Sequence, residues 1–350
     1  MTVSAQARRT RILEALRGTG AVRVVDLAAR LGVPAVTLRR DVAALADEGR
    51  LSRTHGSVEL LTDDRAEPGR DRVIGMLVPT VGQYFDEVVA GARAAAAAAG
   101  ARLVLGIAPY GADSDRVQVQ RLLESEVDGL LLAPDWHPGR GGRDTDWLGE
   151  LPVPAVLVER RAEFGSPAAE LDAVCSHHRH GVLLALRHLA GLGHRAVLLA
   201  ARDDTYTARD VRRGYQEAVA LLGLDALPVT DVPGPADPAA LAARLAEAAA
   251  SGIRAALVHN DQDALQLPAL LRTHGLTVPA DLALVAYDDV YAALADPPLT
   301  AVAPPKRAVG AEALNLLLRR LTEGDTLPTQ QSELLPTLKI RQSCGQRTTG

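Results

Sequence analysis

The chain has 350 residues, of which 47% are hydrophobic and 3% aromatic, and its formal net charge is −5 at pH 7. This length exceeds that of one ordinary domain and suits two or three. The negative balance argues against a protein that binds nucleic acid over its whole length. The longest apolar runs, such as Ala94–Ala99, are too short to cross a bilayer, so we expect no membrane segment.

The charge is unevenly distributed along the chain. Residues 1–60 contain ten Arg and six acidic residues, a net charge of +4, so the remainder carries −9, because −5 minus +4 is −9. A small basic head on an acidic body fits a DNA-reading module joined to a sensor. The alternative is an ordinary soluble protein with a basic end.

The termini and cysteines indicate the compartment. The N-terminus has no signal peptide, because Arg8, Arg9 and Arg11 lead into an amphipathic helix and not into an apolar run. Cys175 and Cys344 show no metal-ligand spacing, which favours a reducing compartment without disulfides. We therefore expect a cytoplasmic protein.

The first elements predict a helix-turn-helix over about residues 24–43. Val24–Gly32 reads as a short helix that ends at a glycine. A second helix follows, in which Leu38, Val42 and Leu45 form a buried stripe. Arg39 and Arg40 fall between these apolar positions and point away from them. A helix, a tight glycine turn and a second helix with two adjacent arginines is the layout of a DNA-binding helix-turn-helix.

Residues 50–60 alternate loosely around a central glycine, as a two-stranded wing would. The whole of residues 8–60 resembles the winged helix of DeoR-type transcription regulators. The motifs that carry this resemblance are Arg11–Leu16, Val25–Gly32, Thr37–Asp41 and Arg53–Gly56. Pro34 departs from the family, which usually has a Ser or Thr that caps the recognition helix. We assign residues 1–60 to this domain.

Residues 61–72 are charged, contain Pro-Gly and lack periodicity, which is typical of a linker. Beyond them short apolar runs alternate with helical stretches, a pattern that predicts parallel sheets flanked by helices. The expected strands are Val73–Val78, Ala101–Leu105, Val127–Leu132, Pro154–Val158, Arg195–Ala200, Ala255–His259 and Leu282–Tyr287. The expected helices are Glu87–Ala99, Asp115–Glu126, His180–Leu192, Asp210–Leu222, Pro238–Ala250 and Asp263–His274. Two runs of such units suggest two α/β lobes with a cleft between them.

Residues 73–342 resemble the effector-binding domain of the lac/gal-repressor family, whose fold is that of periplasmic sugar-binding proteins. The residues that carry this resemblance are Ile74–Pro79, Val127–Pro134, His188–His194, Ala208-Arg209 with Gly214-Tyr215, Asn260-Asp261, Tyr287–Asp289 and Pro297–Thr300. The resemblance implies an α/β fold of two parallel-sheet lobes. We place lobe 1 at about 73–160 plus 291–322 and lobe 2 at about 161–290 plus 323–342, with a tail at 343–350.

In the head, Arg39 and Arg40 are the best candidates to contact DNA, since a guanidinium matches guanine or a phosphate. Thr37 lies where it could reach a base edge or a phosphate. Arg53 and His55, on the expected wing, suit contacts to the DNA backbone. The alternative for all of these residues is a solvated basic face.

In the sensor, the resemblance implies that Arg209 grips two sugar hydroxyls and that Asn260 and Asp288 bind further hydroxyls. It also matches Tyr84 and Phe85 to an aromatic pair after the first strand, although Phe85 could equally belong to the core.

Three positions depart from the family: residues 81–83 are one residue short, Glu159 replaces an aspartate, and His177–His180 replaces a polar stretch. We expect Glu159 and His178 to face the ligand. The three histidines lack the partners of a metal site, so we expect no metal and no cofactor.

Together these features predict a DNA-binding transcription regulator, a repressor controlled by a sugar or sugar derivative bound between two lobes. We expect a homodimer on double-stranded operator DNA and no catalytic residues, because nucleophile-elbow, phosphate-loop and zinc motifs are missing. Two alternatives are a solute-binding receptor and an enzyme that handles sugars or sugar phosphates. The basic head disfavours the first, and the lack of a glycine-rich phosphate loop disfavours the second.

Overall fold

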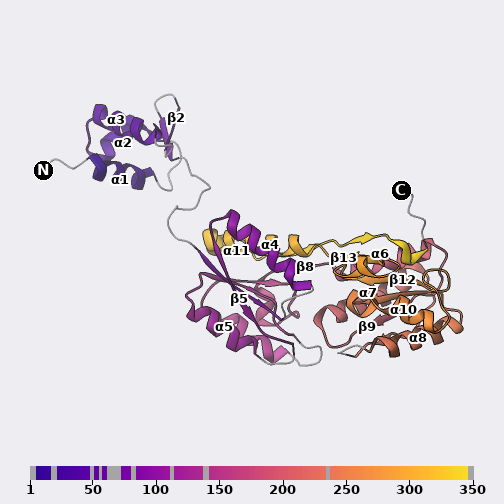
Figure 1. Cartoon of the computed structure of the whole chain (residues 1–350). Coiled ribbons are helices and arrows are strands. Elements are labelled where there is room, and N and C mark those ends of the chain that lie inside the picture. Colours follow the sequence, from indigo (N-terminus) through magenta and orange to yellow (C-terminus); the bar gives the residue numbers. More distant parts are fainter. Residues whose placement is uncertain are drawn as a thin grey trace. The chain divides into compact units, whose positions relative to one another are not determined.

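A computed structural model describes residues 5–16, 22–47, 51–54, 57–60, 72–79, 84–110, 114–136, 142–233 and 237–345 (Figure 1). The chain divides into two compact units, Met1–Arg70 and Asp71–Gly350, which we describe separately. The expected linker lies outside the described residues, except for Arg72. Among the described residues, every helix is too short or too polar to cross a lipid bilayer.

The first unit is a helix-turn-helix with a wing, as predicted. Its helices are α1 (Ala5–Leu16), α2 (Val24–Leu31) and α3 (Ala35–Asp47), and its antiparallel strands are β1 (Val22–Arg23), β2 (Leu51–Thr54) and β3 (Ser57–Leu60) in the order β1-β3-β2. Gly32 adopts a left-handed conformation with φ of 64° and ends α2. Ile12, Leu27 and Leu38 contribute to a shared core.

The first sheet of the second unit is entirely parallel, in the order β14-β8-β7-β6-β4-β5. Its strands are β4 (Val73–Val78), β5 (Arg102–Ile107), β6 (Gly129–Leu132), β7 (Ala155–Val158), β8 (Asp172–Ser176) and β14 (Gln331–Leu334). The helices that pack with it are α4 (Tyr84–Ala98), α5 (Asp115–Glu124) and α11 (Lys306–Glu323), joined by the short 3₁₀ helices η1 (Gly142–Glu150), η2 (Pro167–Glu170) and η4 (Gly324–Thr326).

The second sheet has the order β10-β9-β11-β12-β13-β15, parallel except for the antiparallel β13–β15 pair. Its strands are β9 (Leu198–Ala201), β10 (Thr230–Asp231), β11 (Ala255–His259), β12 (Ala283–Tyr287), β13 (Thr300–Ala303) and β15 (Thr337–Lys339). Its helices are α6 (His178–Gly191), α7 (Tyr206–Leu222), α8 (Pro238–Ala250), α9 (Asp261–Ala264) and α10 (Leu267–Thr273), with η3 (Ala292–Leu294) and η5 (Gln342–Cys344). The predicted two-lobed α/β fold is confirmed.

The chain crosses between the lobes later than we expected. Strand β8 belongs to the first sheet because it pairs with β7, whereas the expected boundary put it in the second lobe. Likewise β13 stays in the second sheet beside β12, and β14 joins the first sheet beside β8. Each of these three strands forms a parallel pair within its own lobe before the chain leaves that lobe. All three crossings between the lobes therefore lie nearer the C-terminus than we expected.

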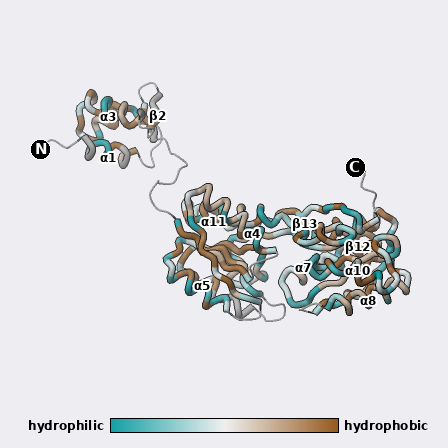
Figure 2. The backbone as a smooth tube through the Cα atoms, viewed as in Figure 1, coloured by the Kyte–Doolittle hydropathy of each residue, from teal (hydrophilic) through white to brown (hydrophobic). Residues whose placement is uncertain are grey.

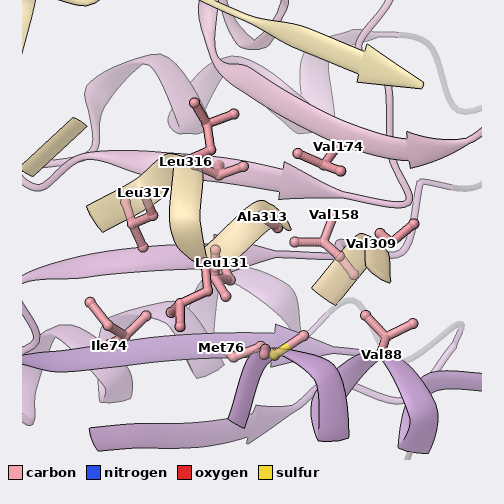
Figure 3. Close-up of a cluster of buried hydrophobic side chains, with 14 of the residues drawn as sticks. Ile74, Met76, Val88, Leu131, Val158, Val174, Val309, Ala313, Leu316 and Leu317 are labelled. Atoms are coloured by element: carbon pink, nitrogen blue, oxygen red, sulfur yellow. The ribbon is translucent and has the colours of Figure 1, made fainter. Parts of the chain in front are cut away.

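The core of the first lobe lies between the sheet and helices α4 and α11 (Figure 3). Ile74, Met76 and Leu131 from the strands are fully buried, as are Val309 and Leu317 from α11. The central strands β4, β6 and β7 of this sheet are continuously hydrophobic segments (Figure 2). Such strands are expected where helices cover both faces of a parallel sheet.

Two glycines allow α4 and α11 to approach closely. An ideal Cβ on Gly310 would lie 1.9 Å from the carbonyl oxygen of Val88, and one on Gly91 would lie 2.0 Å from that of Arg307. Because both obstacles are backbone atoms, only a shift of a whole helix could relieve the clash.

We therefore predict that Gly310→Ala lowers the free energy of unfolding by about 1–3 kcal/mol, the usual effect of overpacking a core. The measurement is urea unfolding of the intact chain. Gly191→Ala is the matched control, since Gly191 ends helix α6 with no atom within 4 Å of its ideal Cβ. Equal stability of the two variants would contradict the close helix packing.

Candidate functional site

The outer face of α3 carries the exposed residues that the sequence assigns to DNA. Arg39 and Arg40 are exposed and Thr37 is half-buried, whereas Leu38 and Leu45 point into the core. Among the described residues, neither arginine of this pair forms an ion pair, so both guanidinium groups remain available to a ligand. Arg53 lies on β2, and His55 lies outside the described residues.

Buried Asp41 fixes the orientation of this helix. Its carboxylate accepts a hydrogen bond of 2.9 Å from Nε of Arg8, and Nε of Arg9 lies 3.8 Å away. Both arginines come from α1, so Asp41 ties α1 to α3. This arrangement leaves Arg39 and Arg40 free of a structural role.

A cavity of about 420 Å³ opens in the second unit, where strands β7 and β8 end and helices α6 and α7 begin. The carboxyl ends of parallel strands are the usual place for ligands in α/β folds. Its lining is rich in charged groups and consists of Glu159, Arg161, Ala162, Glu163, Phe164, Cys175, Ser176, His178, Arg179, Tyr206, Arg209, Asp210, Arg213 and Glu333.

Glu159, buried at the base of this cavity, is held by several protein donors. Its Oε1 accepts hydrogen bonds from the Tyr84 hydroxyl at 2.6 Å and from the Ser176 hydroxyl at 2.7 Å. Its Oε2 accepts the Ser176 N–H at 2.8 Å and lies 3.5 Å from Nε2 of His178. Because these donors already occupy most of its acceptor positions, Glu159 positions the pocket wall and has little capacity left for a ligand.

His178 and Glu159 form a charged pair. Burial alone lowers the pKa of His178, but the contact with Glu159 outweighs burial and leaves this pKa above its ordinary value. Burial raises the pKa of Glu159, yet hydrogen bonding and charge from His178, together with Tyr84, bring it below its usual range. His178 also contacts Tyr287, whose hydroxyl donates to the His178 carbonyl at 3.0 Å.

Asp288 directly follows strand β12 and is buried with a left-handed φ of 91°. Burial and the charge of Asp261 raise the pKa of Asp288 to about 7, although Lys306 opposes the shift. The ammonium group of Lys306 donates to the Asp288 carbonyl and lies 5.4 Å from the centre of the Tyr84 ring. Oδ1 of Asp288 has no hydrogen-bond partner, which makes it available to a donor on a ligand.

The remaining predicted effector residues are dispersed. Arg209 lines the cavity 4.7 Å from the Tyr206 ring and pairs with Glu163 at 3.2 Å. Asn260 caps α9 by accepting the Asp263 N–H, and it is not among the residues that line the cavity. Phe85 is only 4% exposed within the core of the first lobe, which agrees with the alternative reading of that residue.

Sequence reasoning missed Arg160, Trp136 and Tyr206. The rings of Trp136 and Tyr206 meet edge-to-face at 6.0 Å and join the two lobes. The Tyr206 hydroxyl also donates to the Arg161 carbonyl at 2.7 Å. Arg160 and Trp136 follow strands that were predicted correctly, so their position at strand ends was the available signal.

The three neighbouring histidines have structural roles in the described chain. Nδ1 of His177 accepts the His180 N–H at 3.1 Å and so caps helix α6, while His178 pairs with Glu159. Within the described ranges, no group of three or more His, Cys, Asp or Glu side chains is arranged to hold a metal ion.

Comparison with known proteins gives two matching family models. A DeoR-like helix-turn-helix domain matches residues 8–64, and a periplasmic binding protein-like domain matches residues 186–344. An HTH-type transcriptional regulator of unassigned role, from the aml 5' region of Streptomyces limosus, is 32% identical over 271 residues, which is 69% of this chain and 69% of that protein.

Among the solved structures that share the fold, two are regulators bound to a ligand. The lac repressor dimer bound to operator and the anti-inducer ONPF has a TM-score of 0.65 and 23% identity, covering 79% of this chain and 95% of that one. The complex of the transcriptional regulator CelR with cellobiose also has a TM-score of 0.65, with 24% identity, and covers 98% of this chain and 100% of the other.

The buried pair gives a pH-dependent prediction. Glu159→Gln removes a charge that compensates His178, so the free energy of unfolding should fall by about 3 kcal/mol near pH 6. The raised pKa of His178 stabilises the fold below about pH 6.5, and this contribution is lost as pH rises through the pKa of the folded state. The difference between wild type and variant should therefore shrink near pH 9, as measured by urea unfolding at both pH values. A difference that does not change with pH would contradict the charged pair.

Proposed function

The chain belongs to the LacI-type family of ligand-controlled, DNA-binding transcription regulators, and from this premise we propose that it is a repressor whose operator affinity is set by a polyhydroxylated effector. The observation that carries this proposal is the presence in one chain of an exposed arginine pair on a helix-turn-helix and a polar cavity at the strand ends of a two-lobed unit.

In the proposed complex, helix α3 enters the major groove of the operator. Arg39 and Arg40 then supply guanidinium groups to guanine edges or phosphates, and Thr37 adds a hydroxyl. Two chains place two such helices on a two-fold symmetric operator. The lac repressor, which shares the fold, was solved as a dimer bound to its operator.

The chemistry around the cavity favours a sugar or sugar derivative. Aromatic residues make up only 3% of the chain, yet Tyr84, Trp136, Phe164 and Tyr206 all lie in or beside the site. Ring faces pack against the C–H faces of sugars, and charged side chains bind their hydroxyls. CelR, which shares the fold, was solved with cellobiose.

A catalytic role is not part of the proposal. Asp288 and Asp289 are adjacent carboxylates, but Asp289 forms an ion pair of 2.7 Å with Arg341 and is thereby held in a structural role. Ligand binding between the lobes is sufficient for regulation, provided that the effector favours one state by a few kcal/mol.

The first functional prediction concerns DNA. The double substitution Arg39→Ala with Arg40→Ala should weaken operator binding at least about 100-fold, because each bidentate contact discriminates by roughly 1–3 kcal/mol. Fluorescence anisotropy with a duplex from the upstream region of the gene measures this affinity. Arg30→Ala, an exposed arginine on α2, is the matched control and should change affinity far less. Unchanged binding by the double variant would remove α3 from the interface.

The second functional prediction concerns the effector. Arg209→Ala should abolish the thermal stabilisation that a binding sugar gives to the wild type, while operator affinity without the sugar persists. Differential scanning fluorimetry with a panel of mono- and disaccharides measures the shift in melting temperature. Arg187→Ala removes an exposed arginine on α6 that does not line the cavity, and it should keep the shift. A normal shift in Arg209→Ala would refute the assignment of this residue.

A further inference from the structure

Arg160 is a buried guanidinium at the junction of the lobes. Arg160 is only 1% exposed, and it directly follows Glu159 at the end of strand β7. Nε donates to the Pro134 carbonyl at 2.6 Å, and Nη1 donates to the Glu159 carbonyl at 2.8 Å. Nη2 has no hydrogen-bond partner, although burial normally requires one.

Aromatic rings surround this guanidinium. Its Cζ lies 5.4 Å from the ring centre of Tyr206, which belongs to the second lobe, and 5.8 Å from that of Phe85 in the first lobe. Burial raises the pKa of Tyr110, and the charge of Arg160 together with a hydrogen bond to its side chain opposes this rise, so the Tyr110 hydroxyl lies beside the guanidinium. These neighbours stabilise a cation and define an enclosed position between the lobes.

No carboxylate compensates this charge in the described part of the chain. Other arginines near the cleft do have partners: Arg161 pairs with Glu333, Arg202 with Asp204 and Arg209 with Glu163. An arginine stays charged in proteins, and a buried charge without a counter-ion is unfavourable. Arg160 thus has neither a counter-ion nor a partner for one of its N–H groups. A ligand that carries a negatively charged oxygen would supply both.

We infer that Arg160 is a specificity-determining residue that binds an oxyanion on the effector, so that the effector is an acidic or phosphorylated sugar and not a neutral one. Hydrogen bonds between a guanidinium and a carboxylate or phosphate are about twice as strong as neutral ones. This inference rests on the proposed function, because it names the class of effector for the cleft between the lobes. Arg160 is not itself among the residues that line the cavity, but its neighbours in sequence, Glu159 and Arg161, are.

Two buried acceptors complement Arg160. Oδ1 of Asp288 and Oδ2 of Asp263 have no hydrogen-bond partner. Asp288 directly follows β12, and Asp263 lies on the short helix α9 that begins after β11. Carboxylates accept hydrogen bonds from hydroxyl groups, so these positions suit the polyol part of the same effector. The oxyanion is then bound at the end of β7, and the hydroxyls are bound at the ends of β11 and β12.

The test measures ligand affinity of the full chain by isothermal titration calorimetry. The probes are three matched sets: glucose with glucuronate and glucose 6-phosphate, galactose with galacturonate and galactose 6-phosphate, and ribose with ribonate and ribose 5-phosphate. In at least one set, an anionic member should bind about 10-fold or more tightly than its neutral parent. Comparison within that set distinguishes a carboxylate from a phosphate.

Variants then assign the preference to Arg160. Arg160→Gln should lose the preference for the anion and leave the affinity for the neutral parent within about 3-fold, while Arg160→Lys should retain part of the preference. Arg319→Gln, which removes an exposed charge on α11, should retain it fully. Operator affinity without sugar reports whether each variant is folded. If Arg160→Gln misfolds, the preference for the anionic sugar in the wild type and in Arg160→Lys tests the inference.

Three results would overturn the inference. Neutral sugars could bind the wild type as tightly as their anionic counterparts in every set, or Arg160→Gln could lose both classes equally. If no probe bound while operator binding persisted, the acidic-sugar assignment would fail and the DNA-binding function would stand. Loss of operator binding in the wild type would instead refute the proposed function.

Discussion

The second unit depends on one buried carboxylate, that of Glu159, which has to be satisfied inside the protein. Its donors come from the start of α4, the end of β8 and the start of α6, so a single side chain joins both lobes at the point where the chain passes between them. A buried carboxylate without such donors would be strongly destabilising. The geometry of the pocket wall therefore follows from satisfying this group.

Because buried polar groups need hydrogen-bond partners, the residues of the cleft fall into two kinds, those whose partners are supplied by the protein and those that retain unpartnered atoms. The carboxylate of Glu159 is committed to Tyr84, Ser176 and His178, and it shapes the cavity without having much bonding capacity left. Arg160, Asp263 and Asp288 are also buried but retain unpartnered atoms, which is where a ligand can add hydrogen bonds. In the head, Asp41 plays a comparable structural part, because it binds α1 and leaves the arginines of α3 exposed.

Periodicity and strand-end chemistry were sufficient to predict the fold, because buried parallel strands and amphipathic helices have distinct patterns. The lobe boundaries were wrong because β8, β13 and β14 are short, and which sheet they join depends on distant partners. The expected helix at 263–274 is two helices, since Pro268 suits only the first turn of α10. The roles of Glu159 and Arg160 could not be predicted, because they depend on which donors meet in space.

The central claim is that the ligand cleft controls the affinity of the head for DNA. The most direct measurement is the operator affinity of the intact chain, by fluorescence anisotropy at fixed salt, with and without a saturating sugar that binds the cleft. We expect the operator affinity to change by about 5- to 150-fold, the usual range of allosteric coupling. Identical affinities in the two conditions, with the cleft shown to be occupied, would contradict it.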